Sequence, residues 1–231
     1  SCTPGWAGAG AAKSTPPPKP ISSQVSRAWA LGNWPEGALP GVASVGFASD
    51  VPMGRPYNMA AASVEGETNA ADEPLPLRKF IYMSSGYFET MGTRIVAGRD
   101  VTRSEFEAGS QVVVISENFA REFATEPAAA VGRRIRQPLD PQAPWHEVIG
   151  VAQNVHQHGL YQEPPRMVYW LGRVGQDVTF LIRSERAGTA SFTEEIRQAV
   201  RSVSGSTPIV QARTMQDFYA ESLARTAVTL V

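Results

Sequence analysis

The sequence predicts an α+β fold in which a βαβ domain is interrupted by an inserted, β-rich lobe. Near the C-terminus the residue pattern alternates strand, helix, strand and helix, the order expected where one helix packs on a sheet. Residues 85–170 lie between strands of that domain in the sequence, and most elements predicted within them are short strands. With 231 residues, 42% of them hydrophobic, the chain is long enough to bury such a core.

Residues 1–40 differ in composition from the rest of the chain, and we expect a flexible linker or stalk there. Small residues predominate, and the prolines that end at Pro20 lack the amide hydrogen needed to continue a helix. One short helix is predicted at residues 22–31, where Val25 and Trp29 share a face. The ordered domain is predicted to begin near Val42.

Three extended segments are predicted before residue 85. Residues 42–48 and 60–64 have the apolar spacing of strands. Residues 79–84 alternate between two different faces, with Lys79 and Ile81 on the same face.

The run at residues 84–100, SSGYFETMGTRIVAGRD, joins an aromatic-rich turn to a short strand. Gly86 and Gly92 permit a positive φ or a close approach of two backbones. Three large side chains stand on the turn: Tyr87, Phe88 and Met91. We interpret the turn as a packing corner and as the joint between the two lobes.

Arg99 and Asp100 at the end of this run allow two interpretations. As structure, Asp100 caps the turn at residues 101–105 and Arg99 pairs with a nearby carboxylate. As function, the two side chains form a contact surface for a partner. The structural interpretation is favoured.

The rest of the insertion begins with a β-branched strand at residues 111–115, after which Ser116 is placed to cap a helix at residues 117–123. Phe119 and Phe123 would share a face of this helix. Further strands are predicted at residues 132–135, 145–154 and 167–170.

The C-terminal part begins with a strand in which Val178, Phe180 and Ile182 form one buried face. Ser191 and Glu194 then have the spacing of a capping box, so a helix should start there. Its expected end is Gly205, followed by a returning strand at residues 208–212 and a last helix capped by Thr214 and Asp217.

Charge and cysteine content exclude several classes of protein. The 21 basic and 22 acidic residues leave a formal charge of -1, which would not attract nucleic acid. The single cysteine, Cys2, permits no intrachain disulfide and no cysteine-based zinc site. No window of the sequence has the roughly 20 apolar residues that cross a bilayer.

The sequence contains no motif for nucleophilic catalysis and no phosphate-binding loop. His156 and His158 are the one histidine pair with ligand-like spacing, since in a strand both rings would point to the same face. The nearest carboxylate is Glu163, and nothing in the sequence fixes its position. We therefore predict no catalytic, cofactor-binding or metal-binding residue.

The run at residues 84–100 resembles a corner of the extracytoplasmic domain of MacB-like and FtsX-like permeases of ABC transporters, where a GYF..MG..L..GRD pattern recurs. The resemblance continues in the same order along the chain. It covers the segments at residues 39–42, 111–123, 131–135, 149–159 and 164–169.

This resemblance implies a porter-like α+β domain at residues 41–84 and 171–231 with an inserted Sabre-like lobe at residues 85–170. It implies a non-enzymatic domain outside the cytoplasm, between the first two membrane helices of an inner-membrane protein. Residues 223–231 resemble the approach to the second membrane helix, so the chain is expected to stop just before it. In contrast to the family, residues 1–20 would not continue a helix out of the first span.

The implied function is mechanotransmission, in which ATP hydrolysis on a cytoplasmic subunit moves the membrane helices and the outer domain. The implied partners are the permease's own membrane helices, that ATPase and a periplasmic adaptor or lipoprotein substrate, with a homodimer of the full-length permease allowed. Two alternatives stay open. One is a secreted metal-dependent enzyme using His156 and His158, and the other is a periplasmic ligand-binding protein with a deep pocket between lobes.

Overall fold

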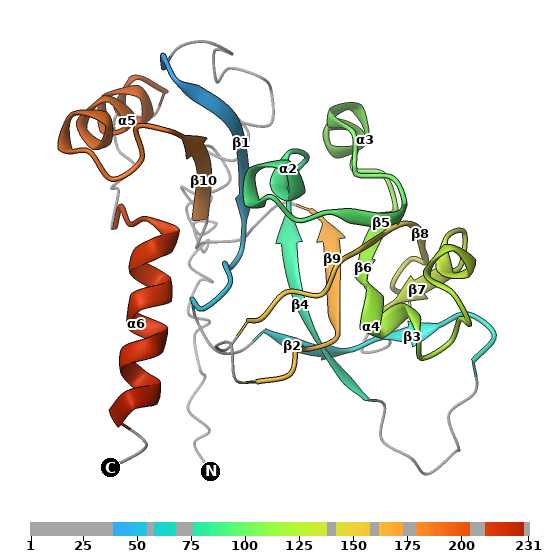
Figure 1. Cartoon of the computed structure of the whole chain (residues 1–231). Coiled ribbons are helices and arrows are strands. Elements are labelled where there is room, and N and C mark those ends of the chain that lie inside the picture. Colours follow the sequence, from blue (N-terminus) through green and yellow to red (C-terminus); the bar gives the residue numbers. More distant parts are fainter. Residues whose placement is uncertain are drawn as a thin grey trace, which may run out of the picture.

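The computed structural model describes most of the chain between Leu39 and Val228 (Figure 1). The described residues are 39–54, 58–67, 76–137, 142–157, 162–172, 179–203 and 211–228. The predicted helix at residues 22–31, Gly205 and most of the predicted strand at residues 208–212 lie outside them. Gln211 and Ala212 are described and are not in a strand.

The described part of the chain contains strands and helices in mixed order. The strands are β1 (Val42–Ala48), β2 (Met59–Ala61), β3 (Ser63–Val64), β4 (Leu77–Met83), β5 (Ile95–Gly98), β6 (Val112–Ser116), β7 (Arg134–Arg136), β8 (His146–Ala152), β9 (Met167–Leu171) and β10 (Thr179–Ser184). The helices are α2 (Tyr87–Met91), α3 (Arg103–Ala108), α4 (Glu117–Ala120), the 3-10 helix η1 (Pro127–Ala130), α5 (Ala190–Val203) and α6 (Met215–Val228). The predicted α+β class is confirmed.

The described strands join in one mixed sheet with the order β10-β1-β4-β9-β6-β8-β7-β3, to which β2 adds beside β4 and β5 beside β8. The β4–β9 and β6–β8 pairs are parallel, and the other pairs are antiparallel. Helices α5 and α6 lie at the end of the sheet formed by β1 and β10, whereas β3, β7 and α4 lie toward the other end (Figure 1).

The central strands are buried on both faces. Every residue of β6 is buried. Val112 and Val114 of β6 face one apolar cluster, while Val113 and Ile115 face another. In β9 the same alternation places Tyr169 in the first cluster. This is why these strands appear in the sequence as continuous apolar runs.

The predicted packing corner is confirmed as helix α2. Gly86 and Gly92 flank it with φ of 79° and 69°, a left-handed conformation that glycine adopts without strain. The Tyr87 and Phe88 side chains are 2% and 1% exposed. Met91 packs against the apolar cluster that contains Tyr87 and Phe88.

Ser116 is the N-cap residue of α4, as predicted, but its side chain makes no capping hydrogen bond. Its hydroxyl accepts a hydrogen bond from the Met167 amide (2.8 Å) and donates to Oδ1 of Asn118 (2.5 Å), so it joins β6 to β9 instead. Helix α4 also ends at Ala120, before the predicted residue 123. Phe119 and Phe123 still pack edge to face, with centroids 5.6 Å apart, although Phe123 lies beyond the end of α4.

Two further expectations near the C-terminus need correction. Helix α5 begins at Ala190, and the Thr189 hydroxyl, not that of Ser191, accepts from the Phe192 amide (3.4 Å). In β10 the most buried side chain is Leu181, on the face opposite Ile182. The reason is that Leu181 packs in the cluster that contains α2, while Ile182 packs with Phe192 of α5.

The capping of α6 is as predicted. The Thr214 hydroxyl accepts from the Asp217 amide (3.2 Å), and Oδ2 of Asp217 accepts from the Thr214 amide (2.7 Å). Each side chain thus satisfies one amide that the first helical turn leaves unpaired.

Asp100 does not cap the helix that follows it. Thr102 is the N-cap of α3, in a capping box with Glu105, and the Asp100 carboxylate accepts from the neighbouring Val101 amide (2.6 Å). The predicted pairing of Arg99 with a carboxylate is confirmed, because its guanidinium donates to both oxygens of Glu105 (2.7 and 2.8 Å). The Glu105 carboxylate therefore takes part both in the capping box of α3 and in the ion pair with Arg99.

Replacing Phe88 by alanine should lower the free energy of unfolding by about 3 kcal/mol, because the ring is fully buried among apolar side chains. Urea unfolding of the variant measures this loss. Tyr219→Ala is the matched control, since Tyr219 is 40% exposed and its truncation should cost much less. Equal losses in both variants would contradict the assignment of the corner to the core.

Glu105 should link stability to pH. Hydrogen bonds from Arg99 outweigh burial and lower the pKa of Glu105 to about 2 in the folded chain, against roughly 4.3 in an unfolded chain. A carboxylate with a depressed folded pKa stabilises the fold above its unfolded pKa, and this contribution is lost as the pH falls toward the folded value. Between about pH 5 and about pH 2, Tm should therefore fall more in the wild type than in Glu105→Gln.

Calorimetry across that pH range measures the difference. Glu126→Gln, an exposed substitution outside α3, provides the control and should retain the wild-type slope. A Glu105→Gln variant with an unchanged slope would show that the Arg99 pair contributes nothing to acid stability.

Candidate functional site

Helix α2 rests directly on the backbone of β1. A Cβ at Gly46 would lie 3.0 Å from the Tyr87 amide nitrogen, and a Cβ at Gly86 would lie 2.6 Å from the Val45 carbonyl oxygen. Both positions therefore need glycine, because any side chain would push the helix off the strand. Figure 1 shows α2 lying beside β1.

The same helix also contacts β9 and β10. The rings of Tyr87 and Phe88 lie 6.0 and 4.9 Å from the ring of Tyr169 in β9. The Arg183 guanidinium of β10 donates through Nε to the Thr90 carbonyl oxygen (3.0 Å). The corner thus contacts strands on both sides of the β1–β4 connection.

A buried ion pair lies beside this corner. Lys79 is 2% exposed and Asp50 is 6% exposed, with 3.7 Å between Nζ and Oδ2. Burial lowers the pKa of Lys79, and the charge of Asp50 opposes the shift. Burial raises the pKa of Tyr87, with further contributions from Tyr169 and Asp50. These four titratable side chains form one buried group, which we name the buried polar cluster.

The buried polar cluster is inaccessible to substrates. Its lysine has the lowered pKa of a nucleophilic amine, but an exposed fraction of 2% leaves no route for a reactant from solvent. Burial also raises the pKa of Tyr169, whose hydroxyl has no hydrogen-bond partner among the described residues. The arrangement can hold the loop after β1 against β4.

Sequence reasoning missed this ion pair, although one signal was present. Lys79 lies in phase with Ile81 on β4, on the face that proved to be buried. A charged residue in phase with core residues indicates a buried partner. Nothing in the sequence identified Asp50 as that partner, since it lies in a loop.

The histidines do not form a metal site within the described residues. His156 lies outside any strand, and its Nδ1 is 2.9 Å from the Gln162 carbonyl oxygen. His158 lies outside the described residues, so the predicted pair is not tested. In the part of the chain that the structure describes, no three His, Cys, Asp or Glu side chains gather as metal ligands. His146 packs edge to face on Trp170 (4.8 Å), and burial lowers its pKa.

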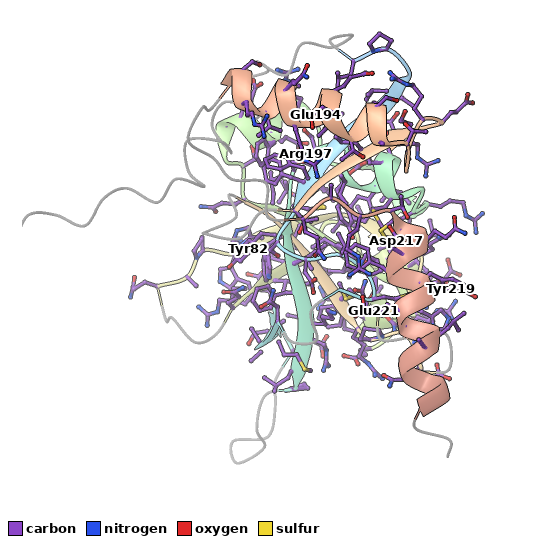
Figure 2. The ribbon with its side chains drawn as sticks, turned by 90° about the vertical axis from the view of Figure 1, so that its left-hand side faces the viewer. Tyr82, Glu194, Arg197, Asp217, Tyr219 and Glu221 are labelled. Atoms are coloured by element: carbon purple, nitrogen blue, oxygen red, sulfur yellow. The ribbon has the colours of Figure 1, made fainter. Side chains whose placement is uncertain are left out.

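Helix α6 exposes apolar side chains. Met215, Tyr219 and Leu223 follow at intervals of four residues and are 40%, 40% and 38% exposed. Figure 2 shows Tyr219 projecting from α6 away from the sheet. Phe218 instead packs against the core, with the Arg213 guanidinium 4.3 Å from its ring centre. Within the described residues, none of the helices is both long enough and apolar enough for a membrane span.

Comparison with solved structures finds similar folds. The periplasmic region of MacB from Actinobacillus actinomycetemcomitans aligns with a TM-score of 0.51 at 15% identity, covering 81% of this chain and 75% of that one. A domain of a putative permease from Porphyromonas gingivalis gives 0.47 at 14% identity, covering 71% and 65%. The extracellular domain of the ABC-type transporter YknZ from Gram-positive bacteria gives 0.43 at 17% identity, covering 80% and 84%.

No curated protein matches the chain significantly. A family model does match, however, over residues 21–198, and it describes the MacB-like periplasmic core domain. This match covers most of the chain and includes the corner, the sheet and most of α5. The chain therefore belongs to the family of MacB-like periplasmic core domains.

Proposed function

We propose that this chain is the extracytoplasmic, non-enzymatic domain of an ABC-type permease and transmits conformational change from a cytoplasmic ATPase to a periplasmic substrate or partner. The family match over residues 21–198 is the observation that supports it. The inaccessible polar cluster fits this role, since a transmitting domain needs rigid, well-packed parts rather than an open reaction site.

We propose the division of the chain that the sequence suggested, with a porter-like part at residues 41–84 and 171–231 and a Sabre-like lobe at residues 85–170. Strands β1 and β10 with helix α5 form one end of the sheet. Strands β6, β8 and β7 come from the inserted segment and lie beyond β9. In this arrangement the two proposed parts share one sheet, in which β4 pairs with β9 and β3 pairs with β7.

The proposed partners are the membrane helices of the same permease, a cytoplasmic ATPase subunit and a periplasmic adaptor or lipoprotein substrate. A homodimer of the full-length permease is included in the proposal. The proposed location is the periplasmic side of the inner membrane. Such a domain would take part in efflux or in lipoprotein release.

The test is whether ATP moves the domain. A single fluorophore at Ala128→Cys, exposed on η1, is placed in the full-length permease with Cys2→Ser, reconstituted in nanodiscs with its ATPase. Energy transfer to acceptors on the lipid headgroups should change when ATP binds, because the domain shifts relative to the bilayer. A parallel label at Arg201→Cys on α5 reports on the other end of the sheet.

An ATPase variant unable to bind nucleotide is the control and should abolish the change at both labels. Identical energy transfer in all nucleotide states, while ATP is hydrolysed, would refute mechanotransmission by this domain.

A further inference from the structure

The sheet narrows to one residue pair between β1 and β4. Strand β1 pairs with β10 along its length, from Val42 to Ala48, and β4 pairs with β9 from Lys79 to Met83. Between β1 and β4 the one paired position is Ala48 with Met83. In the described residues, the hydrogen bonds that join β1 to β4 are therefore confined to the residues on either side of this pair.

The hydrogen bonds on both sides of this pair are irregular in the same way. The Ser84 amide donates to the Phe47 carbonyl oxygen (3.0 Å), but the Phe47 amide donates to the Ser84 hydroxyl (2.9 Å). The Ser49 amide donates to the Tyr82 carbonyl oxygen (2.9 Å), but the Tyr82 amide donates to the Ser49 hydroxyl (3.0 Å). In a regular antiparallel ladder both bonds of each pair join backbone groups.

A serine hydroxyl thus replaces a serine carbonyl oxygen at each end of the contact. The replacement lets the two strands diverge immediately beyond the pair. The Phe47 and Tyr82 amides still have hydrogen-bond acceptors, as amides shielded from water require. The Ser84 hydroxyl also donates to the Ser85 carbonyl oxygen (2.8 Å), so it links the strand to the start of the α2 corner.

The contacts around the pair are mostly apolar. On one face, Ala48 and Met83 share a core cluster with the α2 side chains. On the other face, Phe106 of α3 packs edge to face on Phe47, with centroids 5.3 Å apart. Such contacts lack the directionality of a strand ladder, so they tolerate a small rotation better than a row of backbone hydrogen bonds does.

We propose that Ala48, Met83, Ser49 and Ser84, which we name the serine junction, form the hinge between two halves of this domain. The hinge divides the chain differently from the two lobes proposed above, because β1 and β4 fall on opposite sides of it. One half consists of β1, β10 and α5, and the other consists of β4, β9, β6, β8 and β7 with β5 and η1 beside β8. The inference rests on the proposed function for the source of the motion, but the hinge itself is a property of the isolated chain. The Asp50–Lys79 ion pair lies just beyond the junction and limits the angle between β4 and the loop after β1.

The test measures distances across the junction in the whole 231-residue chain. In a Cys2→Ser background, spin labels at Val96→Cys on β5 and Arg201→Cys on α5 report the separation of the halves. A second pair, at Val96→Cys and Ala128→Cys, lies within one half. The variant Ser49→Ala with Ser84→Ala removes both hydroxyls, and the exposed pair Ser104→Ala with Ser202→Ala is its control.

The distribution across the junction should broaden or gain a second peak in Ser49→Ala/Ser84→Ala, while the distribution within one half stays as in the wild type. The control variant should leave both distributions unchanged. An unchanged distribution across the junction overturns the proposal. Equal broadening of both distributions also overturns it, because it would show a general loss of packing.

Hydrogen exchange of the wild-type chain tests the same hinge if the double variant fails to fold. The Phe47 and Tyr82 amides should exchange at least ~10-fold faster than amides of the β4–β9 ladder, because local opening at a hinge costs less than global unfolding. If both exchange as slowly as the ladder, the junction is rigid and the proposal fails. A mobile hinge in a domain that ATP does not move would refute the proposed function and leave the hinge standing.

Discussion

Helix α2 packs between β1 and β9 and so links the two ends of the sheet. Two rings, Tyr87 and Phe88, are almost completely buried and meet Tyr169 from the inserted segment. The helix backbone lies so close to β1 that Gly46 and Gly86 have no room for a side chain. Among the described residues, β1 and β4 are hydrogen-bonded only next to one residue pair, so this apolar contact is a second connection between the two ends of the sheet.

The polar groups near this contact are paired with one another because the contact is buried. Moving a charge out of water costs free energy unless an opposite charge pairs with it. Lys79 pairs with Asp50, which lies in the loop after β1, and the next residue of that loop, Val51, shares an apolar cluster with the α2 side chains. Serine hydroxyls similarly complete the hydrogen bonding where the strands diverge. The polar side chains near the contact thus join separate segments: the ion pair connects the loop after β1 to β4, and the serine hydroxyls connect β1 to β4.

Local sequence signals predicted some features correctly and others wrongly, and the wrong ones depend on contacts with residues distant in the chain. The Thr214–Asp217 cap and the glycines around α2 depend on neighbouring residues alone, and both are as expected. Ser116 has an equally good local signal for capping, but its hydroxyl bonds to Met167 on another strand. In β10 the alternation was recognised, yet Leu181 is the more buried side chain because α2 and α5 cover both faces of the strand.

The α+β class, most strand positions, the packing corner and the family resemblance could be predicted from the amino-acid sequence, because these depend on residue periodicity, turn chemistry and the order of motifs. The tertiary structure alone decided the order of strands in the sheet, the Asp50–Lys79 pair and the serine-bonded connection of β1 to β4. Each of these joins residues distant in the chain, and periodicity within a segment carries no information about which distant segment it will contact.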